Sequence, residues 1–262
     1  MAFLTGKTAI VTGSTSGIGL AIARALAAEG AAVMMNGFGD KTAIDKLRGE
    51  LAAKNGGKVG YNGADMSKPA EIRTLVAETA KQFGAVDILV NNAGIQHVAP
   101  IVDFPEDRWD AIIAINLSAA FHATKAALPL MTKKRWGRII NIASAHGLVA
   151  SAQKVAYVAA KHGIVGLTKT TAIEAANDGI TCNAICPGWV RTPLVEKQIE
   201  ARAKATGQKV EDAAKTLLGE KQAMLSFVTV EQLGSLAIFL CSDGAATMTG
   251  VTLPMDGGWT AQ

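Results

Sequence analysis

Short apolar runs alternate with longer amphipathic stretches along the chain. The apolar runs predict buried strands at residues 7–12, 31–36, 58–63, 86–90, 137–143, 180–186 and 251–254. The stretches between them repeat apolar residues at helical spacing and predict helices at residues 20–26, 41–55, 69–83, 106–133, 155–167 and 229–242. Regular alternation of strand and helix is typical of an α/β fold with a parallel sheet. We therefore expect one doubly wound, Rossmann-type domain over residues 1–262, with helices on both faces of the sheet.

Residues 193–222 interrupt this pattern because they are more polar than the rest of the chain. Lysine, glutamate and glutamine recur throughout the stretch, and Gly207 lies near its middle. The pattern predicts a pair of helices inserted at the carboxyl ends of the strands. Because ligands bind at that edge of an α/β sheet, we interpret the insertion as a helical lid.

Composition fits this picture and excludes several classes of protein. Apolar residues make up 49% of the chain and aromatic residues only 5%, which suits aliphatic strands under alanine-rich helices. The net charge is +4, and the one tight basic run, Lys133-Lys134-Arg135, fits a solvated helix end. No uncharged apolar run reaches the ~18 residues that cross a bilayer. We expect no nucleic-acid partner and no membrane partner.

The three cysteines, Cys182, Cys186 and Cys241, fit neither a disulfide framework nor a zinc site. We interpret Cys182 and Cys186 as small buried hydrophobic residues, and we expect a reducing compartment and a cytoplasmic protein. No cluster of histidine, cysteine and carboxylate residues has the spacing of metal ligands, so no metal is expected.

A glycine-rich turn joins the first strand to the first helix. It reads Gly-Ser-Thr-Ser-Gly-Ile-Gly over residues 13–19, so its spacing is GxxxGxG rather than GxGxxG. Glycines allow the backbone to approach a pyrophosphate, and the helix N-terminus offers unpaired N–H groups. The turn predicts a dinucleotide site; a purely structural tight turn is the alternative.

The end of the second strand bears on which dinucleotide binds. NAD sites usually place an acidic residue there for the ribose 2′-hydroxyl, whereas NADP sites place an arginine. This chain has Asn36-Gly37-Phe38-Gly39, and the nearest cation is Lys41, so NAD is favoured. Asp65, just after the third strand, could bind the adenine amino group or cap the helix that begins near Pro69.

Tyr157 and Lys161 are four residues apart in a helical stretch, so their side chains share one helix face. A phenol has an unperturbed pKa of ~10, and a neighbouring ammonium lowers it. The pair could therefore move a proton on and off an alcohol or carbonyl oxygen. A chance pairing on an ordinary helix is the alternative.

Other polar residues are expected near this pair. Ser144 follows the strand at 137–143, and His146 leaves that strand on the same side if the chain stays extended. Lys154 precedes Tyr157 by three residues, which places both on one helix face. A cation and neutral donors beside a proton-transfer group suit a small carboxylate. Asn116 lies in an apolar helical run, where it is either a satisfied core amide or holds a water.

Taken together, these residues resemble the short-chain dehydrogenase/reductase family almost from end to end. The features that carry the resemblance are the glycine turn, Asn91-Asn92-Ala93-Gly94, Asn116, Ser144, Tyr157-Val158-Ala159-Ala160-Lys161, and Pro187-Gly188 with Thr192. The resemblance implies a seven-stranded parallel sheet, a nicotinamide cofactor and commonly a homotetramer. The cofactor contacts it implies are Gly13, Thr15, Ser16, Gly17, Ile18, Gly19, Phe38, Asp65, Met66, Asn92, Ala93, Gly94, Tyr157, Lys161, Pro187, Gly188, Val190 and Thr192.

The family resemblance also implies a catalytic tetrad of Asn116, Ser144, Tyr157 and Lys161. In that scheme Tyr157 exchanges the hydroxyl proton, Lys161 lowers its pKa and binds the nicotinamide ribose, and Ser144 holds the substrate oxygen. Asn116 keeps a water that connects Lys161 with solvent.

A narrower resemblance, to the bacterial D-3-hydroxybutyrate dehydrogenase group, rests on Asn36-Gly37-Phe38-Gly39-Asp40, Gly94-Ile95-Gln96-His97, residues 144–151, Lys154, Gln198 and Gly257-Gly258-Trp259. It implies that the substrate carboxylate is held by Gln96, His146, Lys154 and Gln198. Trp189 and Trp259 could enclose the substrate methyl group. The expected activity is NAD-dependent, reversible oxidation of D-3-hydroxybutyrate to acetoacetate, a reaction of ketone-body metabolism.

Two other functions remain open at this point. An NADPH-dependent 3-oxoacyl-thioester reductase would share the fold, but it would need a cation for the 2′-phosphate and no carboxylate site. A catalytically idle nucleotide-binding protein would also share the fold, because a fold does not determine a function. The intact tetrad argues against the idle protein.

Overall fold

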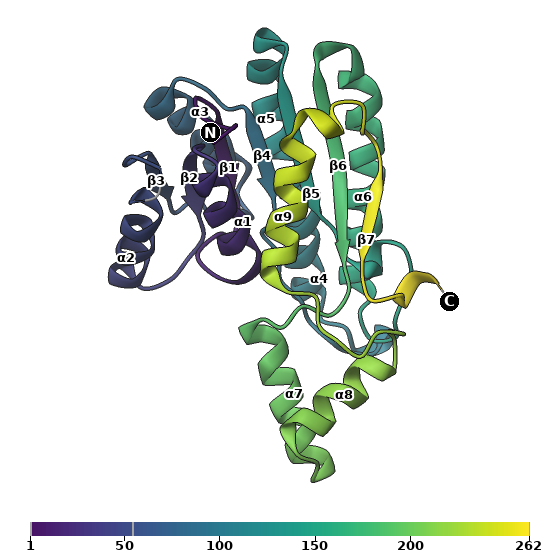
Figure 1. The fold of residues 1–262 in the computed structure, drawn as a ribbon. Coiled ribbons are helices and arrows are strands. Elements are labelled where there is room, and N and C mark those ends of the chain that lie inside the picture. Colours follow the sequence, from purple (N-terminus) through teal and green to yellow (C-terminus); the bar gives the residue numbers. More distant parts are fainter. Residues whose placement is uncertain (1, 54, 262) are drawn as a thin grey trace.

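The computed structural model describes residues 2–53 and 55–261, which form a three-layer α/β structure (Figure 1). Its centre is a parallel sheet with the strand order β3-β2-β1-β4-β5-β6-β7. The strands are β1 Thr8–Val11, β2 Ala32–Asn36, β3 Val59–Asn62, β4 Ile88–Asn91, β5 Gly137–Ile142, β6 Ile180–Pro187 and β7 Thr252–Met255. The predicted doubly wound, seven-stranded parallel fold is confirmed.

Helices cover both faces of this sheet. On one face α1 packs against α9 beside α2, and on the other face lie α3, α5 and α6 (Figure 1). Their bounds are α1 Gly17–Ala28, α2 Lys41–Ala52, α3 Pro69–Phe83, α4 Glu106–Ile113, α5 Ala119–Lys134, α6 Val155–Ala175 and α9 Val230–Cys241. Most lie within a few residues of the predicted ranges, whereas α6 runs well beyond residue 167.

Alternating strand residues supply two separate cores. Val11 and Val33 face α1 and α9 together with Ile22 and Leu240, whereas Ile10 faces α3 and α5. Because both faces of every central strand are buried, the strands read as continuous apolar runs in the sequence.

The long predicted helix at 106–133 is two α-helices joined by a π-helical turn, Ala114–Ser118. By length and composition Glu106–Lys134 is the one stretch among the described residues that could cross a membrane. Its alanines Ala119, Ala123 and Ala127 are buried against the sheet. Its apolar composition is therefore that of a helix packed on a core.

The inserted stretch forms α7, Pro193–Thr206, and α8, Val210–Gly219, as the polar pattern predicted. The two helices extend from the carboxyl end of the sheet (Figure 1) and have a small core of their own that includes Ile199 and Leu217. Ion pairs of Arg191 with Glu211 and of Arg202 with Glu220 hold them together. We call α7 and α8 the lid.

Two smaller predictions concern the surface and the cysteines. Lys134 is the last residue of α5 and pairs with the buried Asp87 at 3.0 Å, so the basic run is a helix end. Cys182, Cys186 and Cys241 are buried free thiols, as expected.

Candidate active site

The glycine turn after β1 packs against the turn after β4. Asn92 Nδ2 donates to the carbonyl oxygens of Thr12 at 2.8 Å and Gly13 at 3.0 Å. A Cβ on Gly19 would lie only 2.4 Å from Asn92 Nδ2, and Gly13 has a φ of +63°. Gly13 and Gly19 therefore allow α1 to approach the sheet closely, which keeps its N-terminus at the strand ends.

A groove runs along this turn and the ends of β2 and β3. It is lined by Gly13, Thr15, Ser16, Gly17, Ile18, Asn36, Gly37, Phe38, Ala64, Asp65, Met66, Asn92, Ala93, Gly94, Ile95, Ile115 and Thr192. Twelve of the sequence-predicted cofactor residues are among them. Gly19 lines neither this groove nor the cavity below, and it acts through packing. These lining residues include no lysine or arginine.

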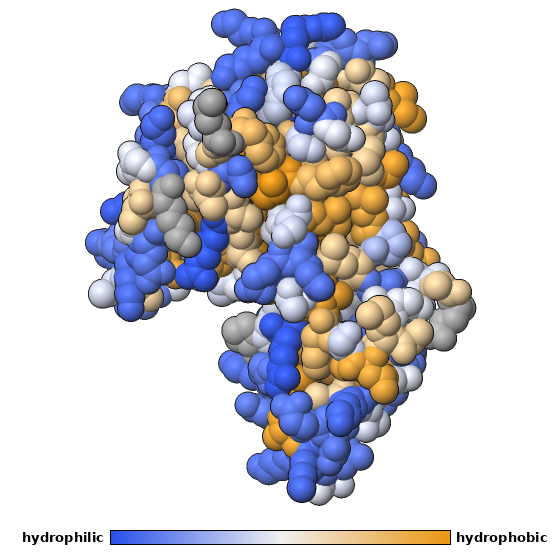
Figure 2. Space-filling view, viewed as in Figure 1, coloured by the Kyte–Doolittle hydropathy of each residue, from blue (hydrophilic) through white to orange (hydrophobic). Residues whose placement is uncertain are grey.

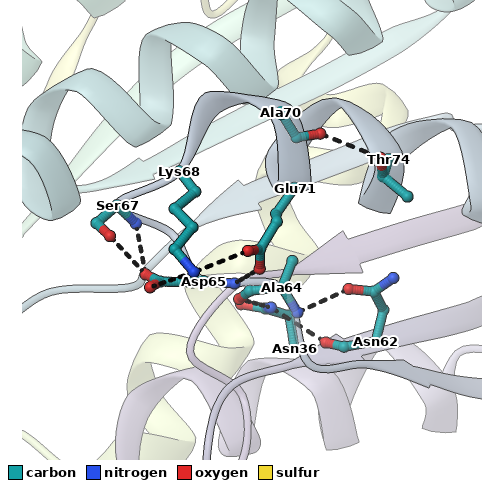
Figure 3. Close-up of polar contacts among 9 residues, drawn as sticks. All are labelled: Asn36, Asn62, Ala64, Asp65, Ser67, Lys68, Ala70, Glu71 and Thr74. Atoms are coloured by element: carbon teal, nitrogen blue, oxygen red, sulfur yellow. Dashed lines mark hydrogen bonds and ion pairs between the residues drawn. The ribbon is translucent and has the colours of Figure 1, made fainter.

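The side-chain amide of Asn36, at the end of β2, makes its hydrogen bonds to backbone groups of the protein. Its Nδ2 donates to the carbonyl oxygens of Asn62 at 3.1 Å and Ala64 at 2.9 Å (Figure 3). Its Oδ1 accepts from Gly13 N at 3.3 Å. The side chain is fully buried. Asn36 therefore ties the glycine turn to β3, and this use of its amide leaves Gly37 and Phe38 to form the edge of the groove.

Asp65 stands at the other side of the groove as an ionised acceptor. Its Oδ1 accepts from the backbone N and the hydroxyl of Ser67, both at 2.8 Å, and these bonds lower its pKa (Figure 3). The alternative role as helix cap is wrong, because Lys68 is the N-cap residue of α3 and the Asp65 carboxylate bonds to Ser67 and Lys68, which precede the helix.

The groove continues into a half-open cavity of about 230 Å³ between the strand ends and the lid. Ile18, Asn92, Gly94, Ile95 and Thr192 line both spaces. The other lining residues are Gln96, Ile142, Ala143, Ser144, His146, Lys154, Tyr157, Lys161, Pro187, Gly188, Trp189, Val190, Val195, Gln198 and Trp259. The cavity thus brings together three of the four predicted catalytic residues and all six predicted substrate-binding residues.

Tyr157 and Lys161 lie one turn apart on α6, with the Lys161 Nζ 5.5 Å from the centre of the tyrosine ring. Lys161 Nζ donates to the carbonyl of Ile142 at 2.7 Å. Burial raises the pKa of Tyr157, and only the Ser144 hydroxyl opposes that rise. Lys161 is not among the groups that shift the Tyr157 pKa, contrary to the expected lowering. Burial also lowers the pKa of Lys161 to about 8.

Ser144 and His146 meet through a bend rather than through an extended chain. Residues Ala145–Gly147 form a 3₁₀ turn, and Ser144 Oγ accepts from the backbone N of His146 at 3.2 Å. The His146 ring lies between two hydroxyls, with Nδ1 3.4 Å from Ser144 Oγ and Nε2 3.0 Å from Ser151 Oγ. Burial and the charge of Lys154 lower the His146 pKa to about 4, so the ring is neutral.

Lys154 reaches the cavity from outside the helix. It is the N-cap residue of α6, with φ −127°, so the expectation that it shares a helix face with Tyr157 is wrong. Its Nζ lies 5.3 Å from the centre of the Trp189 ring, and burial lowers its pKa. The cation still faces the proton-transfer group, because both line the same cavity.

Two tryptophans form one wall of the cavity. The rings of Trp189 and Trp259 are stacked at 6.0 Å with an angle of 24°, and Trp259 meets the edge of His146 at 4.9 Å. Trp259 is 7% exposed. The stack gives the cavity an apolar wall beside its donors, and such a wall suits a short alkyl group.

Asn116 lies in the π-helical turn and acts on the loop after β4. Its Oδ1 accepts from Ile95 N at 2.9 Å and its Nδ2 donates to Ile95 O at 3.0 Å. Asn116 and Lys161 both line a separate closed space of about 10 Å³, which is about the size that one water needs. Both open interpretations of this residue, a paired amide and a water holder, therefore have a geometric basis.

Gln222 is a buried residue that contacts Trp189, and sequence reasoning missed it because its stretch has the composition of a polar lid surface. Among residues 2–53 and 55–261 no group of three or more histidine, cysteine or carboxylate side chains could hold a metal ion.

Several known proteins are similar to this chain in sequence and fold. The model of the short chain dehydrogenases matches residues 7–203, and the chain belongs to that family of oxidoreductases. The D-beta-hydroxybutyrate dehydrogenase of Cupriavidus necator is 63% identical over 260 residues, which cover 99% of this chain and all of the relative. The enzyme of the same name from Rhizobium meliloti is 57% identical over 256 residues, 98% of this chain and 99% of its own.

A solved structure of an actinorhodin polyketide ketoreductase with NADPH superposes on this chain with a TM-score of 0.90. The two are 34% identical, and the match covers 98% of each chain.

Proposed function

We propose that this chain catalyses the reversible, NAD-dependent oxidation of D-3-hydroxybutyrate to acetoacetate. The observation that carries the proposal is that a proton-transfer group, Tyr157 with Ser144, and a cation, Lys154, line one small cavity. A volume of about 230 Å³ lies below the range of pockets for drug-sized ligands and suits a four-carbon acid. Two relatives of 63% and 57% identity carry the name of this activity.

In the oxidation, Tyr157 Oη takes the proton of the substrate hydroxyl while Ser144 Oγ binds the same oxygen. Because burial raises the pKa of Tyr157, the accepting phenolate is scarce at neutral pH and oxidation should become faster as the pH rises. Lys161, with a pKa of about 8, can pass the released proton to the small space it shares with Asn116. Bound NAD supplies the hydride acceptor.

The carboxylate of the substrate is held by Lys154 through a charge-assisted hydrogen bond. Gln96 and the neutral His146 supply further polar contacts from the body of the protein, and Gln198 supplies one from α7 of the lid. The lid therefore contacts the substrate directly, so its closure and the binding of the acid are coupled.

The groove fits NAD better than NADP. A Cβ on Gly37 would lie 2.9 Å from Thr15 Oγ1 and one on Gly13 would lie 3.0 Å from Ala93 Cα, so both glycines are needed for the close packing that shapes this groove. A ribose 2′-phosphate would meet no cation among the lining residues, and the ionised Asp65 would repel it.

An NADPH-dependent 3-oxoacyl-thioester reductase is the second candidate. The close superposition with a ketoreductase that was solved with NADPH favours it. The cation-free groove and the lysine in the cavity favour the hydroxybutyrate dehydrogenase instead.

We further propose a cytoplasmic homotetramer. Apolar residues gather over α9 and β7 (Figure 2), where Phe239 is 44% exposed, and Phe121 on α5 is equally exposed on another helix. Two separate apolar surfaces on one chain suit an assembly with two kinds of two-fold interface. The three free buried thiols fit a reducing compartment.

The test is the formation of NADH by the purified protein with D- and L-3-hydroxybutyrate, each with NAD and with NADP. We expect strong turnover with the D acid and NAD alone. Turnover confined to NADPH and a 3-oxoacyl thioester would favour the second candidate. Tight NADH binding without turnover of either acid would remove the substrate assignment.

A further inference from the structure

Gln222 is a buried amide at the junction of three segments that enclose the substrate cavity. The residue is 3% exposed and follows α8 of the lid, where its backbone N donates to Leu218 O at 2.8 Å. Neither the catalytic tetrad nor the carboxylate-binding set includes it, and it does not line the cavity itself. Any effect on the reaction must therefore pass through its neighbours.

The side-chain amide of Gln222 is fully engaged with backbone groups. Its Oε1 accepts from the backbone N of Trp189 at 2.8 Å. Its Nε2 donates to the carbonyls of Met224 at 3.2 Å and Ser226 at 3.1 Å. Both amide hydrogens are thus used to fold the segment after the lid around the amide, while the oxygen fixes the main chain of the cavity wall.

Two glycines leave room for this amide. A Cβ on Gly188 would lie 2.9 Å from Gln222 Oε1, and a Cβ on Gly257 would lie 2.6 Å from Nε2. Gly257 has a φ of +61° and its carbonyl accepts from Met224 N at 2.9 Å. Gln222 therefore contacts the segment after β6, the end of the lid and the turn after β7 at once.

Two of these segments, the one after β6 and the one after β7, carry the apolar wall of the cavity. Trp189 follows Gly188, Trp259 follows Gly257 by two residues, and their rings are stacked. A shift of either segment would change the distance between the stack and His146, which Trp259 contacts. The position of Gln222 thus determines how much space the wall leaves for the alkyl end of a ligand.

We propose that Gln222 is a positioning residue that sets the size of acid the cavity accepts. It fixes the position of Trp189 relative to the Gly257 turn. The resulting wall admits the methyl group of 3-hydroxybutyrate but excludes a longer chain. This inference rests on the proposed function, since it names the size selection of that same site.

The test compares D-3-hydroxybutyrate with D-3-hydroxypentanoate, which is one methylene longer. Gln222→Met keeps the length of the side chain but loses all three hydrogen bonds. We expect the ratio of kcat/KM for the shorter acid over the longer to fall about tenfold, because one methylene in a well-fitted pocket is worth about that factor. The affinity for NADH should stay within about twofold, since no Gln222 contact reaches the nucleotide groove.

Gln232→Met is the matched control. Gln232 is an exposed amide that completes the capping box of α9, with its Oε1 accepting from Thr229 N at 2.9 Å. Its loss should lower stability without changing the ratio between the two acids. Gln222→Glu keeps an acceptor for Trp189 N and should change the ratio less than Gln222→Met, and it serves if the methionine variant does not fold.

Near-ultraviolet circular dichroism gives a readout that does not depend on catalysis. The stacked pair of Trp189 and Trp259 should give a coupled indole signal that weakens in both Gln222 variants and persists in the control. An unchanged ratio in a folded Gln222 variant, or an equal loss for both acids, would overturn the proposal. A wild-type protein that oxidises neither acid would refute the proposed function, while the dichroism would still test whether Gln222 positions the stack.

Discussion

The protonation of individual side chains in the cavity is governed by burial more than by charge pairing. Burial lowers the pKa values of His146, Lys154 and Lys161 and raises that of Tyr157. Each of these shifts favours the neutral form of the side chain. An anionic ligand would oppose this effect of burial, because its carboxylate would stabilise the charged form of Lys154.

His146 should make the folded protein sensitive to mild acid. Its pKa falls from 6.5 to about 4, so between these values the unfolded chain binds more protons than the folded one. The free energy of unfolding then decreases as the pH falls through this window, by about 2 kcal/mol between pH 7 and pH 5. Urea unfolding of the wild type and of His146→Gln at both pH values measures this contribution. Equal pH dependence of the two proteins would contradict it.

Lys154 should matter for the acid and not for the cofactor. Removing a charged partner from a buried carboxylate costs roughly 1.5–3 kcal/mol, so Lys154→Ala should raise KM for D-3-hydroxybutyrate by about 10- to 100-fold. NADH affinity, measured by fluorescence titration, should change little. Lys215→Ala, an exposed lysine on the lid, is the control. Equal turnover of the acid and its neutral methyl ester by the wild type would contradict a carboxylate site.

Single residues show both the reach and the limit of sequence reasoning. Tyr157, Ser144 and Trp259 could be assigned to one site because their spacing resembles a known family. The exact route of the chain between them could not be predicted: the 3₁₀ turn at Ala145–Gly147 and the non-helical φ of Lys154 depend on tertiary packing. The pKa of Tyr157 also depends on burial, which spacing does not report.

Among the elements, the π-helical turn Ala114–Ser118 is the irregularity that serves the site. It turns Asn116 towards Ile95, and the two hydrogen bonds there fix the loop that carries Gln96. The apolar pattern predicted helix through this region but not the extra residue per turn, because a π-turn has no signature in hydrophobic spacing. The buried Asn116 was the only hint of it.

Asn116→Ala should therefore damage both the fold and the reaction. It would remove both hydrogen bonds to the backbone of Ile95, at a cost of about 0.5–1.5 kcal/mol each, since Ile95 is partly exposed to water. We expect the thermal midpoint to fall and kcat to fall at least tenfold, with a smaller effect on NADH affinity. A variant with normal kcat would show that the turn has no part in the chemistry.

The predicted element order and sheet class proved correct across the molecule because buried parallel strands give uninterrupted apolar runs. Their strand order could not be read from the runs themselves, since the pairing of Ala9 with Ile88 joins positions far apart in the sequence. The contacts of Gln222 with the lid and the cavity wall could not be predicted either, because they join three segments that are not adjacent in the sequence.

The proposed assembly can be tested by removing each exposed apolar surface. Phe121→Glu and Phe239→Glu place a charge on α5 and α9, and each should break one kind of interface and leave dimers. Light scattering after size exclusion measures the mass. Phe3→Glu, at a residue 46% exposed near the N-terminus, should leave the tetramer intact. If the wild-type protein has the mass of a monomer, the proposed homotetramer is refuted.

The central place of β1 in the sheet has a consequence for how the chain folds. β1 is flanked by β2 and β4, whereas β5, β6 and β7 add outward in chain order. Pairing β1 with β4 brings together strands that are about 80 residues apart, and the chain loses conformational entropy before the new contacts form. This step should therefore be slow, and it should leave apolar strands exposed to aggregation. During synthesis, β1 has only one of its two neighbours until residue 91 has emerged, and the sheet then grows in a single direction.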